Sequence, residues 1–292
     1  MNRLIPLLIL IAPLPAWAQL EGVIDLHVHS APDSRPRSID ALEAARMARR
    51  NGMRALVFKN HYTHTASLAY LVAQAVPGIE VYGGIALNRS VGGINPAAIE
   101  HFAQTTGGLG RVVWLPTFDS EHNHLTVTPN PDHVPVTSNG EPLPAVREVL
   151  GLIADHGLSL ATGHSSPEET LLIIREARRL GIDRIIVTHP SSPLSAMSLE
   201  TQREAARLGA LLEYPIALAL PPRELGFEAF AAQIREVGPE HVALSTDLGQ
   251  VLNPVHTDGL NAFLPRLREA GFSQTEIDVM TKSNPARFLG LD

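Results

Sequence analysis

The chain alternates between short apolar runs and amphipathic segments, and this alternation restricts its fold more than any other feature. The apolar runs are rich in β-branched residues and almost continuously apolar, as parallel strands buried on both faces should be. Eight such runs are expected to be strands: 23–29, 54–60, 79–87, 111–117, 158–164, 184–189, 210–215 and 241–247. Strand–helix units repeated in one row without a linker predict a single-domain α/β fold, the (β/α)8 TIM barrel.

The amphipathic segments have recognisable helix ends. The segment 38–52 offers Ser38 as an N-cap and Gly52 as a stop, and 166–181 offers Ser166 as a cap followed by Pro167. Further helices are expected in 95–108, 143–157, 198–209, 227–238 and 258–271. One connection breaks the rhythm: the loop 119–143 is long and rich in Pro, Asn and Thr. A long loop on this side of a barrel is typical of a lid or binding loop, and the alternative is a surface insertion.

The N-terminus has the shape of a secretory signal peptide. Arg3 precedes a short apolar stretch, and Ala16 and Ala18 occupy the small-residue positions before Gln19. We therefore expect residues 1–18 to be cleaved after Ala18 and residues 19–292 to form the barrel in the periplasm or outside the cell. The apolar stretch is shorter than the ~20 residues of a membrane span and contains prolines, so no stable membrane anchor is expected.

Composition limits the chemistry. The formal net charge of −7 argues against a nucleic-acid partner. The chain has 13 histidines and no cysteine, so a metal site would have to use nitrogen and oxygen ligands. We expect a small-molecule substrate, and the sequence leaves open whether the chain forms a homo-oligomer.

Ionisable side chains gather where the predicted strands end. Barrel active sites form at the carboxyl ends of the strands, and residues i and i+2 of a strand share a face. The residues at these ends are His27, His29, Lys59, His164, His189 and Asp247. Burying each of them without a partner would cost several kcal/mol, on the order of the penalty for dry polar groups. A shared site with one or two divalent metal ions would satisfy them together.

Lys59 is unusual because the chain has only two lysines, Lys59 and Lys282. Burial depresses the pKa of a lysine and makes its amine reactive. Beside a divalent cation, Lys59 could carry a carbamate that bridges two metals. It could also remain an ammonium that holds an anionic substrate, or form a structural ion pair.

These residues resemble the amidohydrolase superfamily of metal-dependent hydrolases. The resemblance rests on the His-x-His of the first strand, the single histidines that end the fifth and sixth strands, and the aspartate that ends the eighth. The closing "KSNPARFLGL" is similar to a terminal helix common there. The segments "DLHVHSAPD", "FKNH" and "GGIALNRSVGGINP" are most similar to an uncharacterised bacterial branch of this superfamily. The resemblance covers nearly the whole mature chain.

The resemblance implies a role for each strand-end residue. His27 and His29 would bind the first, more buried metal, and Asp247 would contact it and shuttle protons. His164 and His189 would bind a second metal, or His164 would join the first in a mononuclear site. Zinc is the expected metal, with manganese or iron as alternatives.

The chain departs from the family at the bridging ligand. Many members place a carboxylated lysine at the end of the fourth strand, where this chain has "WLPTFD" with Asp119 and no lysine. Lys59, from the second strand, could take that place.

The expected reaction is hydrolysis of an amide, lactone or ester bond in a small, anionic substrate. A divalent metal lowers the pKa of a bound water toward ~7. Asp247 would accept a proton from that water and return it to the leaving group, and His189 could assist if it is not a ligand. Arg89 could pair with a substrate carboxylate or phosphate, or form a rim salt bridge. Further candidates for substrate contacts are His61, His122, His124 and Tyr214.

Two alternatives remain open from sequence. "DLHVHS" is similar to the opening motif of the polymerase-and-histidinol-phosphatase family, which would make the protein a phosphoesterase. Those barrels usually have seven strands and place a histidine two residues after the closing aspartate, where this chain has Gly249. The other alternative is an exported metal- or ligand-binding barrel without turnover, which would have no need of Asp247 as a proton shuttle.

Overall fold

A computed structural model of the protein describes residues 20–220 and 225–291. The predicted signal peptide, 1–18, lies outside the described residues. Among the described residues, no helix has both the length and the apolar character needed to cross a bilayer.

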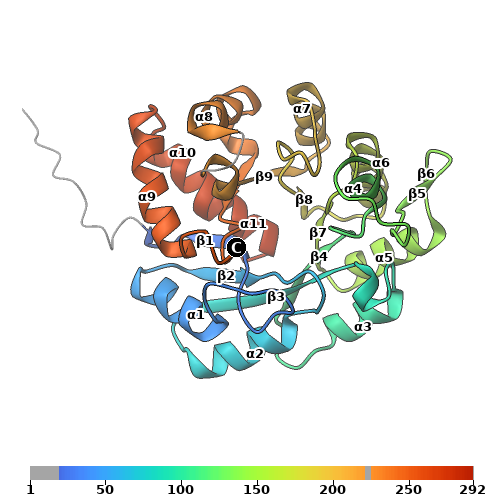
Figure 1. Ribbon diagram of the computed structural model, residues 1–292, viewed down its shortest axis with the longest axis horizontal. Helices are drawn as coiled ribbons and strands as arrows, with labels where there is room; N and C mark the ends of the chain where they lie inside the picture. The colour runs from blue at the N-terminus through green and yellow to red at the C-terminus, as the bar shows by residue number, and fades with distance from the viewer. Residues whose placement is uncertain (1–19, 221–224, 292) are drawn as a thin grey trace, which may run out of the picture.

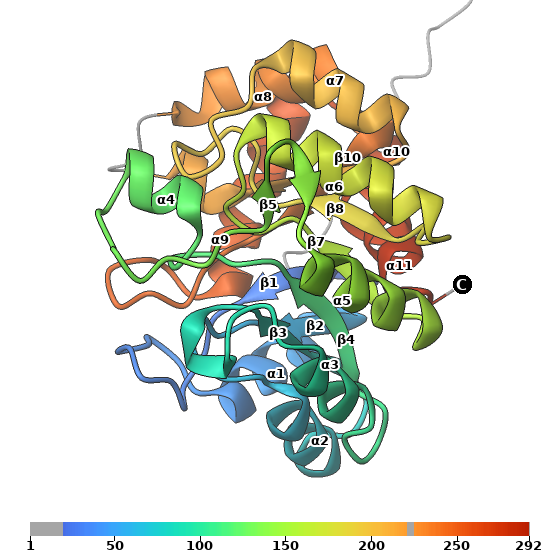
Figure 2. The ribbon, with the colours of Figure 1, turned by 90° about the vertical axis from the view of Figure 1, so that its right-hand side faces the viewer.

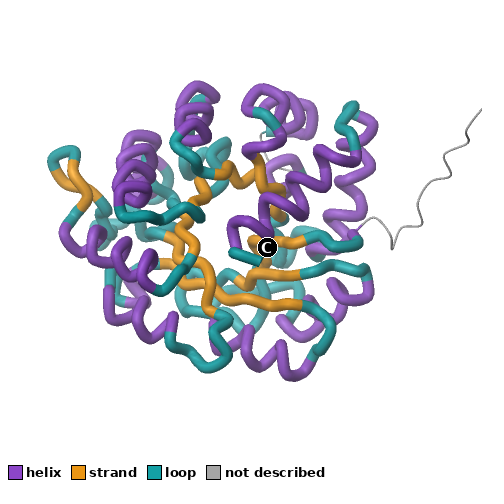
Figure 3. The backbone as a smooth tube through the Cα atoms, turned by 180° about the vertical axis from the view of Figure 1, so that it is seen from behind, coloured by secondary structure: helices purple, strands orange, loops and turns teal. Residues whose placement is uncertain are grey.

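The centre of the molecule is an eight-stranded parallel sheet that curls into a barrel, with helices packed around it (Figures 1 and 3). Its strands follow one another in chain order: β1 Ile24–Val28, β2 Ala55–Phe58, β3 Glu80–Ala86, β4 Gly110–Trp114, β7 Ser159–Ala161, β8 Ile185–Val187, β9 Leu211–Pro215 and β10 Val242–Ser245. Seven lie within the predicted runs and β4 begins one residue before its run, which confirms the single-domain TIM barrel.

The barrel closes between β1 and the segment that follows β10. The backbone N–H of Asp247 donates to the carbonyl of His27 at 2.9 Å, and the N–H of His29 donates to the carbonyl of Leu248 at 2.8 Å. Val28 and Leu248 form an isolated parallel bridge. The seam is therefore held at the carboxyl ends of the strands, where the candidate site residues lie.

The helices between the strands cover the outer face of the barrel. The helices are α1 Ala41–Arg50, α2 Ala66–Ala75, α3 Pro96–Ala103, α4 Glu121–Thr126, α5 Pro144–Asp155, α6 Pro167–Arg179, α7 Leu199–Arg207, α8 Gly226–Val237, α9 His256–Glu269, α10 Gln274–Asp278 and α11 Asn284–Leu289. Short 3-10 turns are η2 Arg89–Val91, η3 Ile216–Ala219 and η4 Pro239–His241, and η5 Val279–Ser283 is a π-helical turn. The α2 helix was not predicted from the sequence.

Two helix starts show how well sequence signals predict helix ends. Ser166 caps α6 as predicted, and it forms a full capping box with Glu169. The prediction of Ser38 as the α1 cap is wrong, because Asp40 accepts the hydrogen bond from the N–H of Glu43. The backbone of Ser38 instead donates to the carbonyl of Gly249, in the loop before the helix.

The long loop 119–143 has some structure of its own. It contains α4 and the antiparallel hairpin of β5 Thr137–Ser138 and β6 Glu141–Pro142. The hairpin projects from the periphery of the barrel beside α5 and α6 (Figures 1 and 3). In the side view of Figure 2, α4 lies on the flank of the molecule where the strands end.

Two apolar clusters stabilise the barrel. The larger one fills the layer between the strands and the helices. The smaller one fills the interior of the barrel, and Phe288 and Leu289 of α11 belong to it. Trp114 also lies in this inner cluster, and Gly84 makes room for it, because a Cβ on Gly84 would lie 2.1 Å from the indole ring.

Candidate metal centre

An irregularity in β1 aims its two histidines into the barrel. The register against β2 shifts between Asp25 and Val28, where three residues of β1 advance against two of β2. Before the shift Leu26 packs in the inner cluster, and after it Val28 packs in the outer one. Neighbouring residues Leu26 and His27 therefore both face inward, and His29 follows on the same side. Bulges often re-aim side chains beside active sites in this way.

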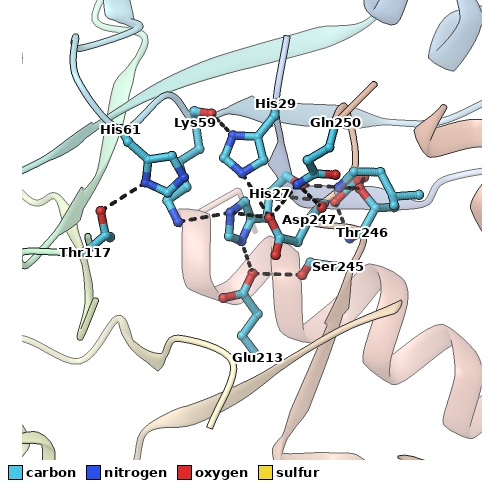
Figure 4. A network of polar contacts seen from close by, with 12 residues as sticks. His27, His29, Lys59, His61, Thr117, Glu213, Ser245, Thr246, Asp247 and Gln250 are labelled. Atoms are coloured by element: carbon cyan, nitrogen blue, oxygen red, sulfur yellow. Dashed lines mark hydrogen bonds and ion pairs between the residues drawn. The ribbon is translucent and has the colours of Figure 1, made fainter. Parts of the chain in front are cut away.

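His27, His29 and Asp247 converge on one point at the barrel mouth (Figure 4). Asp247 Oδ1 lies 3.2 Å from Nε2 of His27 and 2.9 Å from Nε2 of His29. One nitrogen or oxygen atom from each of the three residues lies within 4.8 Å of the others. The histidines are buried, whereas the Asp247 side chain is 20% exposed, so the site opens toward solvent at the carboxylate.

The hydrogen bonds behind the two imidazoles fix which nitrogen faces the mouth. Nδ1 of His29 lies 2.6 Å from the backbone carbonyl of Lys59, which can only accept, so Nδ1 carries the proton. Nδ1 of His27 lies 2.8 Å from a carboxylate oxygen of Glu213 and donates in the same way. Both Nε2 atoms then present lone pairs toward Asp247. Three electron-rich atoms gathered in this way fit a divalent cation.

Glu213, on β9, is a site residue that the sequence analysis missed. It is 2% exposed, and Oε1 accepts from both His27 and the hydroxyl of Ser245, each at 2.8 Å (Figure 4). The carboxylate holds His27 in the tautomer that a metal ligand needs. The signal in the sequence was one acidic residue inside the apolar run "ALLEYP".

Lys59 extends from the end of β2 into the same space. Its Nζ lies 3.0 Å from Nε2 of His27 and 5.3 Å from the centre of the Trp114 ring. Trp114 is the inner-cluster residue at the end of β4. The Trp114 indole thus lies at the end of β4, where many members of the amidohydrolase superfamily have a carboxylated lysine. Lys59 enters the site from β2 instead.

His164 and His189 complete the ring of imidazoles. Their ring centres are 4.9 Å apart, and the His189 ring lies 6.3 Å from that of His27. Nδ1 of each ring is buried without a hydrogen-bond partner in the described part of the chain. Two buried nitrogens without partners are a second reason to expect a cation here.

Two residues of the site also have strained backbone conformations. His189 has φ 27° and Asp247 has φ 50°, in the left-handed region that non-glycine residues rarely adopt. Such conformations persist where the surrounding structure enforces them, and they cluster at functional sites.

Burial dominates the electrostatics of the site. It lowers the pKa of His29 and of His189 to about 4, and it lowers the pKa of His164 well below its usual value. Burial also lowers the pKa of Lys59 to about 8, although Asp247 and Glu213 oppose the shift. Neutral imidazoles are the form that binds metals.

The two carboxyl groups shift the other way. Burial disfavours their ionisation, but His27, as charge and hydrogen-bond partner, together with His189 and Lys59 outweighs burial and lowers the pKa of Glu213 to about 2. For Asp247, His27, His29 and Lys59 together outweigh burial and hold the pKa well below its usual range. Both carboxylates are therefore ionised at neutral pH.

The residues predicted to contact substrate are not all brought to the mouth. His61 is: it is buried, Nδ1 lies 3.0 Å from the hydroxyl of Thr117, and its ring stacks on that of His29 and packs at a tilt against Phe118. Tyr214 is not. It lies on the outer face of β9, where its hydroxyl donates to Gln202, because its neighbour Glu213 takes the inward position.

Arg89, His122 and His124 lie at the rim. Arg89 is half-exposed and paired with Asp132 at 3.2 Å, which is the rim salt bridge that the sequence left open. His122 and His124 are on α4, and the His124 ring stacks on that of His133 within the long loop. An open depression of about 550 Å³ lies beside Arg89, and its lining includes Asp132 and His133 but none of the histidines at the mouth.

Comparison with known proteins places the fold among hydrolases. A family model described as "Family of unknown function (DUF6282)" matches residues 22–213. No curated protein matches the sequence. The organophosphorus hydrolase from Deinococcus radiodurans is 17% identical with a TM-score of 0.57, and the match covers 94% of both chains. A mutant of a PTE-like lactonase from the same organism is 18% identical with a TM-score of 0.58, covering 94% of this chain and 98% of the other. These similarities show that the chain shares the barrel fold of these two hydrolases.

Proposed function

Because this chain belongs to the family of unknown function DUF6282, we propose its activity from its own site: a metal-dependent hydrolase that cleaves an amide, lactone or ester bond in a small, anionic substrate. The observation that carries the proposal is the convergence of His27, His29 and Asp247, with both Nε2 lone pairs and a carboxylate oxygen directed at one point. The hydrolase names of proteins with a similar fold support it.

The residues present fit one or two divalent ions, with zinc proposed first and manganese or iron as alternatives. His27, His29 and Asp247 would hold the first ion, and His164 and His189 would supply the nitrogens for a second. We further propose that Lys59 is carboxylated and bridges the two, because it enters the site from β2 while Trp114 takes up the end of β4. When bound, a divalent ion supplies a Lewis acid and lowers the pKa of its water.

Asp247 would move the proton during hydrolysis. It is ionised, it is the most accessible member of the centre, and its backbone is anchored to β1 through the carbonyl of His27. The carboxylate can accept a proton from the attacking water and donate it to the leaving nitrogen or oxygen. Glu213 fixes the ring of His27, and His61 and Phe118 form one wall of the mouth.

The phosphoesterase alternative has less support. The barrel has eight strands, and Gly249 stands where that family has its histidine. Gly249 has φ 122°, and a Cβ there would lie 1.9 Å from the carbonyl oxygen of His29. A histidine at this position would therefore require the chain to move.

The test is an assay of the purified protein on panels of amides, lactones, esters and phosphoesters, with and without added zinc or manganese. We expect turnover of a carbon-centred substrate that disappears on chelation and returns with metal. Turnover of phosphoesters alone would favour the second family, and metal binding without any turnover would favour a binding protein.

We also propose that the protein is exported and cleaved after Ala18, which would place the barrel in the periplasm or outside the cell. N-terminal sequencing of the native protein should then begin at Gln19. An intact Met1 in the cytoplasmic fraction would contradict this proposal.

A further inference from the structure

A buried arginine beside the mouth has more hydrogen-bond donors than the described residues satisfy. The Arg37 side chain is 4% exposed and the Asp33 side chain 1% exposed, and the two form an ion pair. Nε of Arg37 donates to Asp33 Oδ2 at 2.7 Å, and Nη2 lies 2.5 Å from the same oxygen. Nη2 nevertheless has no well-aligned acceptor in residues 20–220 and 225–291, because one oxygen serves both nitrogens. A guanidinium has five N–H donors and stays charged at any physiological pH.

The guanidinium lies on the side of the loop that faces the metal centre. Arg37 forms an antiparallel bridge with Gln250, and residues directly opposite in such a pair project to the same side. The Gln250 side chain is directed at Asp247: its Nε2 donates to the Asp247 carbonyl at 2.8 Å and lies 3.5 Å from Oδ1. Burial is the main cause of the lowered pKa of His29 and of Lys59, and the charge of Arg37 lowers both further, as expected for a neighbour.

We propose that Arg37 is the anion anchor of this site, and that its unsatisfied donors bind a carboxylate carried by the substrate. This inference rests on the proposed function and specifies the substrate class. The substrate would carry one carboxylate away from the bond that is cleaved. Hydrolysis of an amide, lactone or ester then generates a second carboxylate at the metal centre, so the acid product is a dicarboxylate.

The other arginines near the mouth are less suited to this role. Arg89 is half-exposed, and its partner Asp132 is exposed as well. Arg35 is exposed, donates to the hydroxyl of Tyr62 and lies over the ring of Phe118. Exposed ion pairs contribute little because water screens them, whereas a buried guanidinium held by Asp33 is fixed in place before the anion arrives.

The probes that test the anchor are dicarboxylates, which mimic the product. Binding of malonate, succinate, glutarate and adipate to the metal-loaded protein would be measured by calorimetry, with acetate as the single-carboxylate reference. We expect one chain length to bind more tightly than acetate. Arg37→Gln should remove that advantage, about 10- to 100-fold for a lost charged hydrogen bond, and leave acetate binding unchanged. Arg89→Gln is the matched control and should bind the whole series as the wild type does.

Two further variants keep the test decisive. Arg37→Lys retains the charge but not the fork, and should bind the preferred dicarboxylate with intermediate affinity. If Arg37→Gln fails to fold because Asp33 is left unpaired, the double variant Asp33→Asn, Arg37→Gln removes both charges and gives the same expectation.

The proposal is overturned if no dicarboxylate binds more tightly than acetate, or if the Arg37 variants bind the series as the wild type does. Calorimetry needs no turnover, so this outcome is independent of the hydrolase assay. Loss of dicarboxylate binding in Arg37→Gln would support the anchor even if no tested bond is cleaved, and that failure would count against the proposed function alone.

Discussion

The two halves of the barrel interior are built on the same strands but are opposite in character. Toward the amino ends, the inward positions are apolar, as with Ile24, Val57 and Ala243, and Phe288 of α11 packs with them. Toward the carboxyl ends, the inward positions hold His27, Lys59, Glu213 and Asp247, all buried or nearly so. The half at the amino ends of the strands, here the lower half, stabilises the fold through apolar burial. The half at the carboxyl ends, here the upper half, holds the charged side chains and the unpartnered nitrogens.

Stability and function are therefore provided by different halves of the barrel interior. Apolar burial needs no ligand, so the lower half is complete as it stands. The upper half contains strained backbone at His189 and Asp247 and buried nitrogens that have no partner among the described residues, and both features lower stability. A bound cation would offset the cost of the strained backbone and of the unpartnered nitrogens. Changes in the upper half should therefore affect metal binding and turnover. Changes in the lower half should affect stability alone.

The largest expected effect follows from Asp247→Asn. Asparagine keeps the shape, tolerates the left-handed backbone and retains one oxygen ligand, but it cannot accept the proton. We expect kcat and kcat/KM to fall together by about 10²–10⁴-fold, the usual contribution of a general acid–base group. Metal content and melting temperature should be measured on the same sample. Undiminished kcat in a folded, metallated variant would refute the proton-transfer role.

Lys59→Ala should remove both metal and activity if the lysine carries a carbamate bridge. The loss should exceed the 10- to 100-fold typical of groups that only support a ligand. Formate or acetate should partly restore both by filling the vacated space. A variant with full metal content and only a raised KM would instead identify Lys59 as a cation for the substrate.

Glu213→Gln should have a smaller effect. The amide can still accept from His27, but it lacks the charge that favours the correct tautomer. Metal affinity should drop about 10- to 100-fold in a competition titration with a chelator. Tyr214→Phe is the matched control on the opposite face of β9 and should leave metal affinity as it is. If the two variants bind metal equally well, Glu213 does not support His27.

Phe288→Ala, in the lower half, should have the smallest effect on the site. Removing this buried ring should lower the free energy of unfolding by about 3–5 kcal/mol, as measured by urea denaturation. Turnover per folded molecule and metal content should match the wild type. A loss of metal without a loss of stability would contradict the proposal that the lower half provides stability and the upper half provides metal binding.

The strands and the mouth could be predicted from sequence because both depend on local pattern. Runs such as 184–189 are apolar throughout, and the strand-end histidines stand out against them. The bulge in β1 could not be predicted, since it arises from pairing with β2 and strict alternation would also turn Asp25 inward. The carboxylate of Asp25 instead accepts from the hydroxyl and the N–H of Thr246 across the seam.

Other misses have similar causes. Tyr214 was predicted to contact the substrate, but Glu213 faces the site. Alternation along β9 allows either residue to point inward, and only the packing on both faces of the strand decides which one does. Arg37 was overlooked because its burial depends on a loop that folds back beside Gln250. Arg89 stood out by its position after β3, but pairing with the long loop accounts for its charge.

The most direct test of the account is the metal content of the wild type beside the double variant His27→Ala, His29→Ala. Both proteins would be purified in parallel, checked for folding by circular dichroism and analysed for elements by mass spectrometry. We expect one or two equivalents of a divalent metal, zinc first, in the wild type and a large loss in the folded double variant. Equal metal content in the two proteins would mean that these histidines are structural, and it would contradict the central claim that the barrel mouth is a metal centre.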